Sequence, residues 1–111
     1  MGGSFDVIVL GAGPAGSSCA RRAAELGARV PILEKSDFPR AKPCGAGLTD
    51  KTVALMGGEE KQVEHRRFDS AEISFGRHLS LLVGRQTPLI VTTTRRELDA
   101  RLVASAETAG V

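Results

Sequence analysis

The sequence contains no tryptophan and no tyrosine, and it has only 4 phenylalanines and 2 cysteines among 111 residues. The hydrophobic core must therefore be mainly aliphatic, and a hydrophobic content of 41% is enough to form one domain. Cys19 and Cys44 have neither CxxC spacing nor a paired histidine, and two cysteines do not make a disulfide framework. We therefore expect no metal site and a reducing compartment.

Long apolar runs are also missing. No run approaches the ~20 residues of a membrane span, and the first apolar segment leads directly into a glycine-rich turn, unlike a signal peptide. The net charge of +2 is too balanced for a dedicated nucleic-acid surface. We expect a cytoplasmic protein with no membrane span and no nucleic-acid partner, and peripheral membrane contact remains open.

The most informative stretch is residues 5–35, in which an apolar run leads to the turn Gly11-Ala12-Gly13-Pro14-Ala15-Gly16. An alanine-rich run, a second apolar run and an acidic residue follow. This order predicts a buried parallel strand over residues 6–10, a helix over residues 14–26 and a second strand over residues 29–33. The predicted fold class is α/β, with a Rossmann-type nucleotide-binding domain.

The three glycines of the turn have separate expected roles. Gly11 allows the tight turn, Gly13 lets backbone N–H groups approach a diphosphate, and Gly16 lets the helix pack against the strand. The helix N-terminus then presents unpaired N–H groups and a positive dipole end to the anion. Glu34, 23 positions after Gly11, is placed to accept the two hydroxyls of an unphosphorylated ribose. NADP is therefore disfavoured at this site, whereas FAD and NAD both remain.

Residues 35–47 are predicted to form a basic loop on the diphosphate side, because they combine prolines and glycines with Lys35, Arg40 and Lys42. Its small residues could lie against a flavin ring, although a flexible loop without a ligand is the alternative. We expect Cys44 to lie near a cofactor, and a direct chemical role is the less favoured reading. Cys19 is expected to pack in the core.

The first helix is expected to turn Ala15, Cys19, Ala23 and Leu26 inward, and Pro31 should sit where its nitrogen faces outward or at an edge of the sheet. A short helix over residues 49–56, with Thr49 or Asp50 as its cap, should end at Gly57-Gly58. Strands over residues 68–75, 78–83 and 89–93 indicate a section of antiparallel β-structure outside the nucleotide-binding fold. A last helix over residues 94–109, with capping-box spacing at its start, should bury Leu98, Leu102, Ala106 and Ala109.

We predict that residues 1–48 and 89–111 form the nucleotide-binding core and that residues 49–88 form a helix plus a small β-rich insertion. Because Val111 looks like the first residue of another strand, we also expect the chain to be the N-terminal part of a longer protein.

Four motifs together resemble the geranylgeranyl reductase family of FAD-dependent oxidoreductases, within the larger superfamily of aromatic hydroxylases. They are GAGPAGS, LEK, FPRxKPCGxGLT and RRELDxxL. Family members commonly have CGG where this chain has CGA. The resemblance implies FAD contacts from Gly11, Gly13, Pro14, Ala15, Gly16, Glu34, Lys35, Arg40, Cys44, Gly45, Ala46, Gly47 and Arg95, with Arg96 as an alternative to Arg95. No catalytic residue is evident.

The same resemblance implies an enzyme that reduces carbon–carbon double bonds of an isoprenoid (geranylgeranyl) substrate, with NADPH or another reductant as electron donor. The alternatives are a flavin-dependent monooxygenase or halogenase of the same superfamily, an NAD-dependent dehydrogenase, and a nucleotide-binding module without catalysis. We expect this stretch alone to be inactive.

Overall fold

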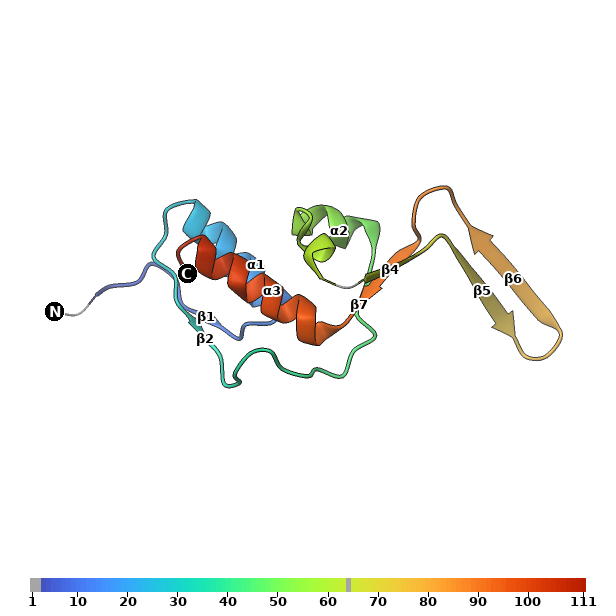
Figure 1. The fold of residues 1–111 in the computed structure, drawn as a ribbon, viewed down its shortest axis with the longest axis horizontal. Coiled ribbons are helices and arrows are strands. Elements are labelled where there is room, and N and C mark those ends of the chain that lie inside the picture. The colour runs from blue at the N-terminus through green and yellow to red at the C-terminus, as the bar shows by residue number, and fades with distance from the viewer. Residues whose placement is uncertain (1–2, 64) are drawn as a thin grey trace. The chain divides into compact units, whose positions relative to one another are not determined.

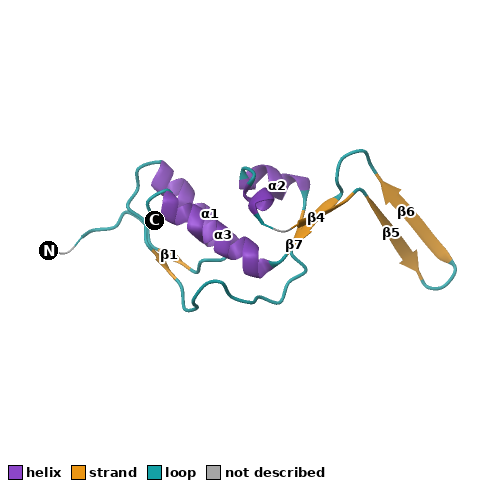
Figure 2. Cartoon of the chain, in the orientation of Figure 1, coloured by secondary structure: helices purple, strands orange, loops and turns teal. Residues whose placement is uncertain are grey.

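The computed structural model describes residues 3–63 and 65–111. The chain forms two compact units, Met1–Cys44 with Arg95–Val111 as the first and Gly45–Thr94 as the second. Figures 1 and 2 show the elements of each unit. The second unit extends a few residues beyond the predicted insertion at each end. The reason is that the strand over residues 47–48 pairs with the strand over residues 90–93, which places both strands in this unit.

The first unit is built on a parallel strand–helix–strand motif. Strand β1 (Val9–Leu10) pairs in parallel with β2 (Ile32–Leu33), and helix α1 (Pro14–Glu25) connects them. Helix α3 (Arg95–Thr108) lies beside α1 (Figure 1). This connection is the one that the glycine turn predicts, and it brings the carboxyl ends of both strands to one edge.

Both strands are shorter than predicted, and Pro31 is the physical reason. The backbone pairing does extend outward, since Asp6 N donates to Arg29 O at 2.9 Å. Val9 N donates to Pro31 O at 3.0 Å, so the backbone of Pro31 faces β1 and does not point outward. Among the described residues β2 lies at an edge of its two-stranded sheet, which is the other position predicted for this proline. Proline has no N–H, and one bond of the ladder is therefore missing at this position.

The buried face of α1 differs from the predicted one. Ser17 and Ala20 are fully buried, whereas Ala15 and Cys19 are exposed and Leu26 is 71% exposed. The expectation that Cys19 packs in the core is therefore wrong for this chain. The helix carries small or apolar residues on more than one side, and the side with Ser17 and Ala20 is the one that the rest of the chain covers. Ser17 also donates its hydroxyl to Ala12 O at 2.9 Å.

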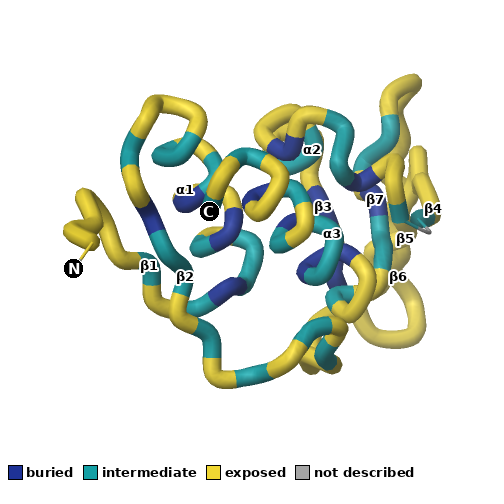
Figure 3. Tube along the Cα trace, turned by 60° about the vertical axis from the view of Figure 1, so that its left-hand side comes forward, coloured by how far each residue is buried: buried dark blue, intermediate teal, exposed yellow. Residues whose placement is uncertain are grey.

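Helix α3 carries the larger core side chains of the first unit. Leu98, Leu102 and Ala106 are 1%, 3% and 0% exposed, as the spacing predicts, and Ala109 is half-buried. Figure 3 shows buried positions on both long helices. Gly110, with φ of +105°, follows the helix end. Across the described ranges, no helix combines the length and the apolarity needed to cross a membrane.

The second unit contains an antiparallel sheet in the order β3-β7-β4, formed by β3 (Gly47–Leu48), β7 (Ile90–Thr93) and β4 (His65–Phe68). Helix α2 (Asp50–Met56) and the 3₁₀ turn η1 (Glu59–Gln62) follow β3. Thr49 caps α2 by accepting from Thr52 N at 3.4 Å, and Gly57 ends it in the left-handed region with φ of +63°, both as predicted.

A separate hairpin completes the second unit. Strand β5 (Ser70–Phe75) pairs antiparallel with β6 (Leu79–Gly84), and both expose every residue (Figure 3). The prediction of one strand over residues 68–75 is wrong, because β4 ends at Phe68 and β5 begins at Ser70. The backbone oxygens at this break accept from residues after β6: Phe68 O accepts from Leu89 N at 2.7 Å, and Asp69 O accepts from Arg85 N at 3.0 Å. The predicted loop over residues 35–47 also ends earlier, where β3 begins.

Candidate functional site

The glycine turn follows β1 directly and has the geometry that its sequence demands. Gly11 has φ of +94°, which is unfavourable for residues with a side chain, and its N–H donates to Leu33 O at 2.8 Å. A Cβ on Gly16 would lie 1.9 Å from the Gly11 carbonyl oxygen and 3.3 Å from Val9 Cγ1. Only glycine at position 16 therefore allows α1 to approach the strand this closely.

Helix α1 begins at Pro14 with Gly13 as its N-cap, in an extended conformation with φ of −69° and ψ of 179°. The first N–H groups of a helix have no partner within the helix. Gly13 has no side chain that could cap them, and proline at the first helical position contributes no N–H. The start of α1 therefore presents backbone donors and a positive dipole end, which together suit an anion.

Glu34 stands immediately after β2 and ties the two strand ends together. Its Oε2 accepts from Ala12 N at 2.8 Å, and its Oε1 accepts from Ser36 N at 3.0 Å. The hydrogen bond from Ala12, which is the largest influence, lowers the pKa of the Glu34 carboxyl from its ordinary 4.5, and desolvation opposes this shift. A carboxylate offers about four acceptor positions, so this one retains capacity for hydroxyl donors.

Four charged side chains form an alternating chain next to Gly13. Arg95 Nε and Nη2 donate to Asp99 Oδ1 and Oδ2 at 2.7 and 2.9 Å. Arg40 Nη1 donates to the same Oδ2 at 3.1 Å, and Arg40 Nη2 lies 4.0 Å from Glu34 Oε2. Asp99 is 0% exposed, while the two arginines are 16% and 17% exposed. One buried carboxylate therefore holds two guanidinium groups, one from a loop and one from α3.

Further contacts fix both arginines. The Arg40 guanidinium lies over the Phe38 ring at 4.8 Å from the centroid. The hydrogen bond to Asp99, which is the largest influence, raises the pKa of the Arg95 guanidinium, and a hydrogen bond with the Cys44 side chain raises it further. Arg96 is exposed. The geometry therefore selects Arg95 over Arg96 as the arginine that belongs to this cluster.

A basic cavity of about 500 Å³ lies at this place. Four cationic side chains line it against a single carboxylate, that of Glu34. Its lining consists of Gly11, Gly13, Glu34, Lys35, Ser36, Arg40, Ala41, Lys42, Pro43 and Arg95. Cations that converge near an uncapped helix start suit a ligand with more than one negative charge.

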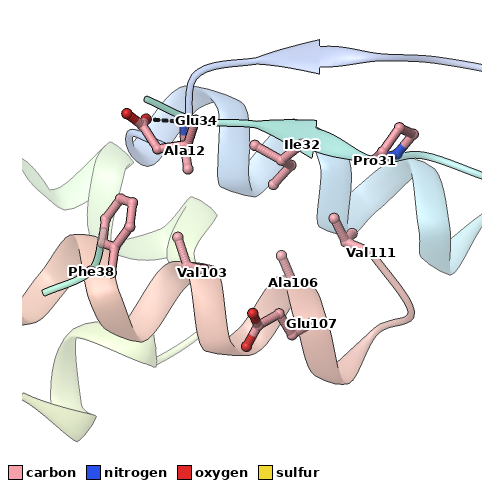
Figure 4. Close-up of a pocket in the computed structure, with 9 residues that line it drawn as sticks. All are labelled: Ala12, Pro31, Ile32, Glu34, Phe38, Val103, Ala106, Glu107 and Val111. Atoms are coloured by element: carbon pink, nitrogen blue, oxygen red, sulfur yellow. Dashed lines mark hydrogen bonds between the residues drawn. The ribbon is translucent and has the colours of Figure 1, made fainter. Parts of the chain in front are cut away.

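A second cavity, of about 270 Å³, lies between β2 and α3 and is mostly apolar. Figure 4 shows that Ile32, Val103 and Ala106 point into it, with Glu34 and its hydrogen bond to Ala12 at one end. Phe38 and Val111 contribute further apolar lining. Glu34 therefore lines both cavities, and a ligand that spans them would pass its carboxylate.

The structure gathers six of the predicted site residues around the basic cavity: Gly11, Gly13, Glu34, Lys35, Arg40 and Arg95. Pro14, Ala15 and Gly16 form the first turn of α1, and Cys44 contacts Arg95. Neither Asp99 nor the Ala12 N–H is among the predicted site residues. The i, i+4 spacing of Arg95 and Asp99 on a helix was the available signal for their pairing.

Gly45, Ala46 and Gly47 belong to the second unit. Ala46 is buried in the left-handed region with φ of +46°, and its carbonyl accepts from Thr93 N at 3.3 Å. Gly47 pairs with Thr92 in the sheet. The backbone here leads into β3 and hydrogen-bonds with β7, and the FAD contacts of these three residues stay a prediction.

Comparisons with curated proteins identify reductases as relatives. A menaquinone reductase of Mycobacterium tuberculosis is 39% identical over 113 residues, which cover 96% of this chain and 28% of that protein. Digeranylgeranylglycerophospholipid reductase 1 of Methanopyrus kandleri is 46% identical over 54 residues, which cover 48% of this chain and 14% of that protein. The chain thus spans less than a third of the length of the curated relatives that it matches.

Solved structures of flavoproteins share the fold. The myxobacterial chondrochloren halogenase, a variant of FAD-dependent halogenases, matches with a TM-score of 0.80 and 28% identity over 96% of this chain and 27% of that chain. A geranylgeranyl bacteriochlorophyll reductase-like protein of Thermoplasma acidophilum matches with a TM-score of 0.78 and 25% identity over 96% and 28%. The predicted Rossmann-type α/β fold and the resemblance to geranylgeranyl reductases are confirmed. Residues 5–109 match the pyridine nucleotide-disulphide oxidoreductase family, and the chain belongs to that family of oxidoreductases.

Proposed function

We propose that this chain binds FAD through its ADP portion and forms the cofactor-binding part of a flavin-dependent reductase that acts on isoprenoid carbon–carbon double bonds. The observation that carries the proposal is the position of Glu34 between an apolar and a basic cavity. An adenine suits the apolar cavity, a ribose suits the carboxylate, and a diphosphate suits the arginines and the start of α1. The three parts of an ADP group follow in that order.

The residues of the first unit have defined tasks in this proposal. Gly13 and the N–H groups of α1 receive the diphosphate, and Arg40 and Arg95 compensate its charge. Glu34 accepts the ribose hydroxyls while it still holds Ala12 N. When bound, FAD supplies the transfer of hydride or electrons, and the protein supplies its position and electrostatic environment.

The substrate class is supported by the relatives. Two of them are named a menaquinone reductase and a digeranylgeranylglycerophospholipid reductase. The second name specifies a lipid with geranylgeranyl chains, which supports an isoprenoid substrate. The electron donor is proposed to be NADPH or another reductant. The halogenase structures favour a second candidate, a flavin-dependent halogenase, because one of them matches this chain with a TM-score of 0.80.

Cofactor binding is tested first, with the full-length protein. We expect the purified protein to be yellow with a flavin spectrum, or to become so when FAD is added to the apoprotein. Isothermal titration should show that Glu34→Ala weakens binding of both FAD and adenosine, because both present the ribose. The exposed substitution Ser18→Ala on α1 serves as the matched control. Failure of the folded wild-type protein to bind FAD would contradict the proposal.

Catalysis is tested second, with geranylgeranyl lipids and a reductant. The expected product gains the mass of two hydrogen atoms for each reduced double bond, measured by mass spectrometry. The same protein supplied with the reductant, oxygen, a halide and an aromatic acceptor should yield no halogenated product. The opposite pattern would assign the halogenase function instead and leave FAD binding intact.

A further inference from the structure

We propose that Asp99 is a positioning residue that holds Arg40 and Arg95 as a pair of guanidinium groups for the diphosphate. The proposal rests on the proposed function, because it concerns the same site. Asp99 itself lines neither cavity and is 0% exposed, so it acts on a ligand only through the two arginines.

The contacts show how one carboxylate controls two cations. Asp99 accepts two hydrogen bonds from Arg95 and one from Arg40, at 2.7 to 3.1 Å. A carboxylate with two donors from one guanidinium fixes the plane of that group as well as its distance. The Nη2 atoms of both arginines end 3.9 Å from the position that a Cβ of Gly13 would occupy. The pair therefore flanks the start of α1.

Electrostatics explain why an acidic residue is needed in a site for an anion. Two guanidinium groups repel each other, and Arg95 stands at the N-terminus of α3, where the helix dipole disfavours a cation. Asp99 offsets both effects and leaves the three side chains with a net charge of one positive unit. Each guanidinium has five N–H donors, so the bonds to Asp99 leave donors for an anion.

Loss of the Asp99 carboxylate should disturb both arginines. A buried carboxylate is tolerated when it is paired and hydrogen-bonded, and this one is satisfied by the two arginines alone in the contacts described. Asparagine has the same shape but replaces one oxygen with an NH₂ donor. That donor would face a guanidinium donor, so at least one arginine must turn away.

The test measures ligand affinity with and without a diphosphate. Full-length wild-type protein and Asp99→Asn are titrated with FAD, ADP, adenosine and inorganic pyrophosphate. A charge-assisted hydrogen bond contributes enough that its loss weakens binding about tenfold. We expect Asp99→Asn to lower the affinity for FAD, ADP and pyrophosphate about tenfold or more. The affinity for adenosine should change by less than about twofold.

A double-substitution background separates positioning from a structural role. In Arg40→Gln/Arg95→Gln protein, Asp99→Asn should cause no further loss of ADP affinity, because the groups through which it acts are gone. Leu98→Val, a change at the neighbouring buried position of α3, is the matched control for general loosening of the helix. If Asp99→Asn fails to fold, Arg95→Lys keeps the charge without the two-atom contact and should still weaken ADP selectively.

Several results would overturn the proposal. Equal losses for ADP and adenosine, a loss with Leu98→Val as large as with Asp99→Asn, or unchanged ADP affinity in both Asp99→Asn and Arg95→Lys would each do so. Wild-type protein that binds pyrophosphate but no flavin would refute the proposed function and leave the positioning role standing. Wild-type protein that binds neither would refute both.

Discussion

Two glycines three positions apart, Gly13 and Gly16, should respond differently to substitution by alanine. Gly13 lies at φ of −69° and ψ of 179°, which alanine adopts without strain. A Cβ there would meet Arg40 and Arg95 at 3.9 Å, an ordinary van der Waals distance. At Gly16, in contrast, a Cβ would lie 1.9 Å from the Gly11 carbonyl oxygen, and backbone would have to move.

The expected stabilities follow from these distances. In Gly13→Ala the weaker N-cap costs up to about 1 kcal/mol, and the less flexible unfolded chain returns about 0.4–1 kcal/mol. The free energy of unfolding should therefore stay within about 1 kcal/mol of wild type. In Gly16→Ala the overpacking costs about 3 kcal/mol, and the better helix propensity of alanine returns only about 1 kcal/mol. We expect a net loss of about 2 kcal/mol.

Cofactor affinity should separate the two variants further. The methyl group of Gly13→Ala would stand at the start of α1 between the two arginines, where the proposed diphosphate must approach. Losing two charge-assisted hydrogen bonds of about 1.5 kcal/mol each corresponds to about 100-fold weaker FAD binding. The Gly13→Ala protein should therefore be stable but bind FAD only weakly. Gly16→Ala should be unstable, whatever its affinity.

Urea unfolding measures the stabilities, and titration with FAD measures the affinities, with the exposed Ser18→Ala as control for α1. Wild-type affinity in Gly13→Ala would show that no diphosphate approaches this residue. A Gly16→Ala protein as stable as wild type would refute the close contact between the helix and the turn.

Three further predictions concern single side chains. Hydrogen bonding lowers the pKa of Glu34, so the ionised carboxylate contributes to stability above pH 4.5 and this contribution is lost as the pH falls below that value. The difference in unfolding free energy between wild type and Glu34→Gln should therefore shrink in acid. A difference that stays constant with pH would refute this. Among the described residues no hydrogen bond reaches the buried Glu60 carboxylate, and Arg67 Nη2 lies 3.9 Å from its Oε1. Glu60→Met should therefore raise the unfolding free energy by about 1 kcal/mol. A lower unfolding free energy would show that Glu60 has an unrecognised partner. Leu98→Ala should cost about 2–5 kcal/mol in urea unfolding, because the side chain is 1% exposed, and a smaller cost would indicate that the helix collapses onto the cavity.

Local chemistry made much of the fold predictable from the sequence. The left-handed glycines at positions 11 and 57 and the cap at Thr49 each depend on a few neighbouring residues, and all three have the predicted role. The strand–helix–strand order also follows from local patterns, since buried strands and an amphipathic helix differ in period. The break at Asp69 was missed because residues 68–75 alternate without interruption.

Long-range packing was less predictable, and α1 shows why. An alanine-rich helix has similar hydrophobicity on several faces, so spacing alone could not identify Ser17 and Ala20 as its buried side chains. The ion cluster has the same difficulty, because Arg40 and Asp99 are 59 positions apart. Sequence spacing could suggest the pair of Arg95 and Asp99, but only the packing of α3 brings the loop arginine to the same carboxylate.

The contacts of Glu34 connect the glycine turn to the pair of arginines within one network of hydrogen bonds and charges. The carboxylate holds Ala12 N within the glycine turn, lies 4.0 Å from Arg40, and through that arginine connects to Asp99. Asp99 also holds Arg95, so four side chains, Glu34, Arg40, Asp99 and Arg95, hold one another. Side chains held by such contacts lose less conformational freedom when a ligand binds, so part of the affinity comes from avoiding the cost of ordering them. This argues that the two acidic residues matter as much to the binding of an anionic cofactor as the arginines beside them.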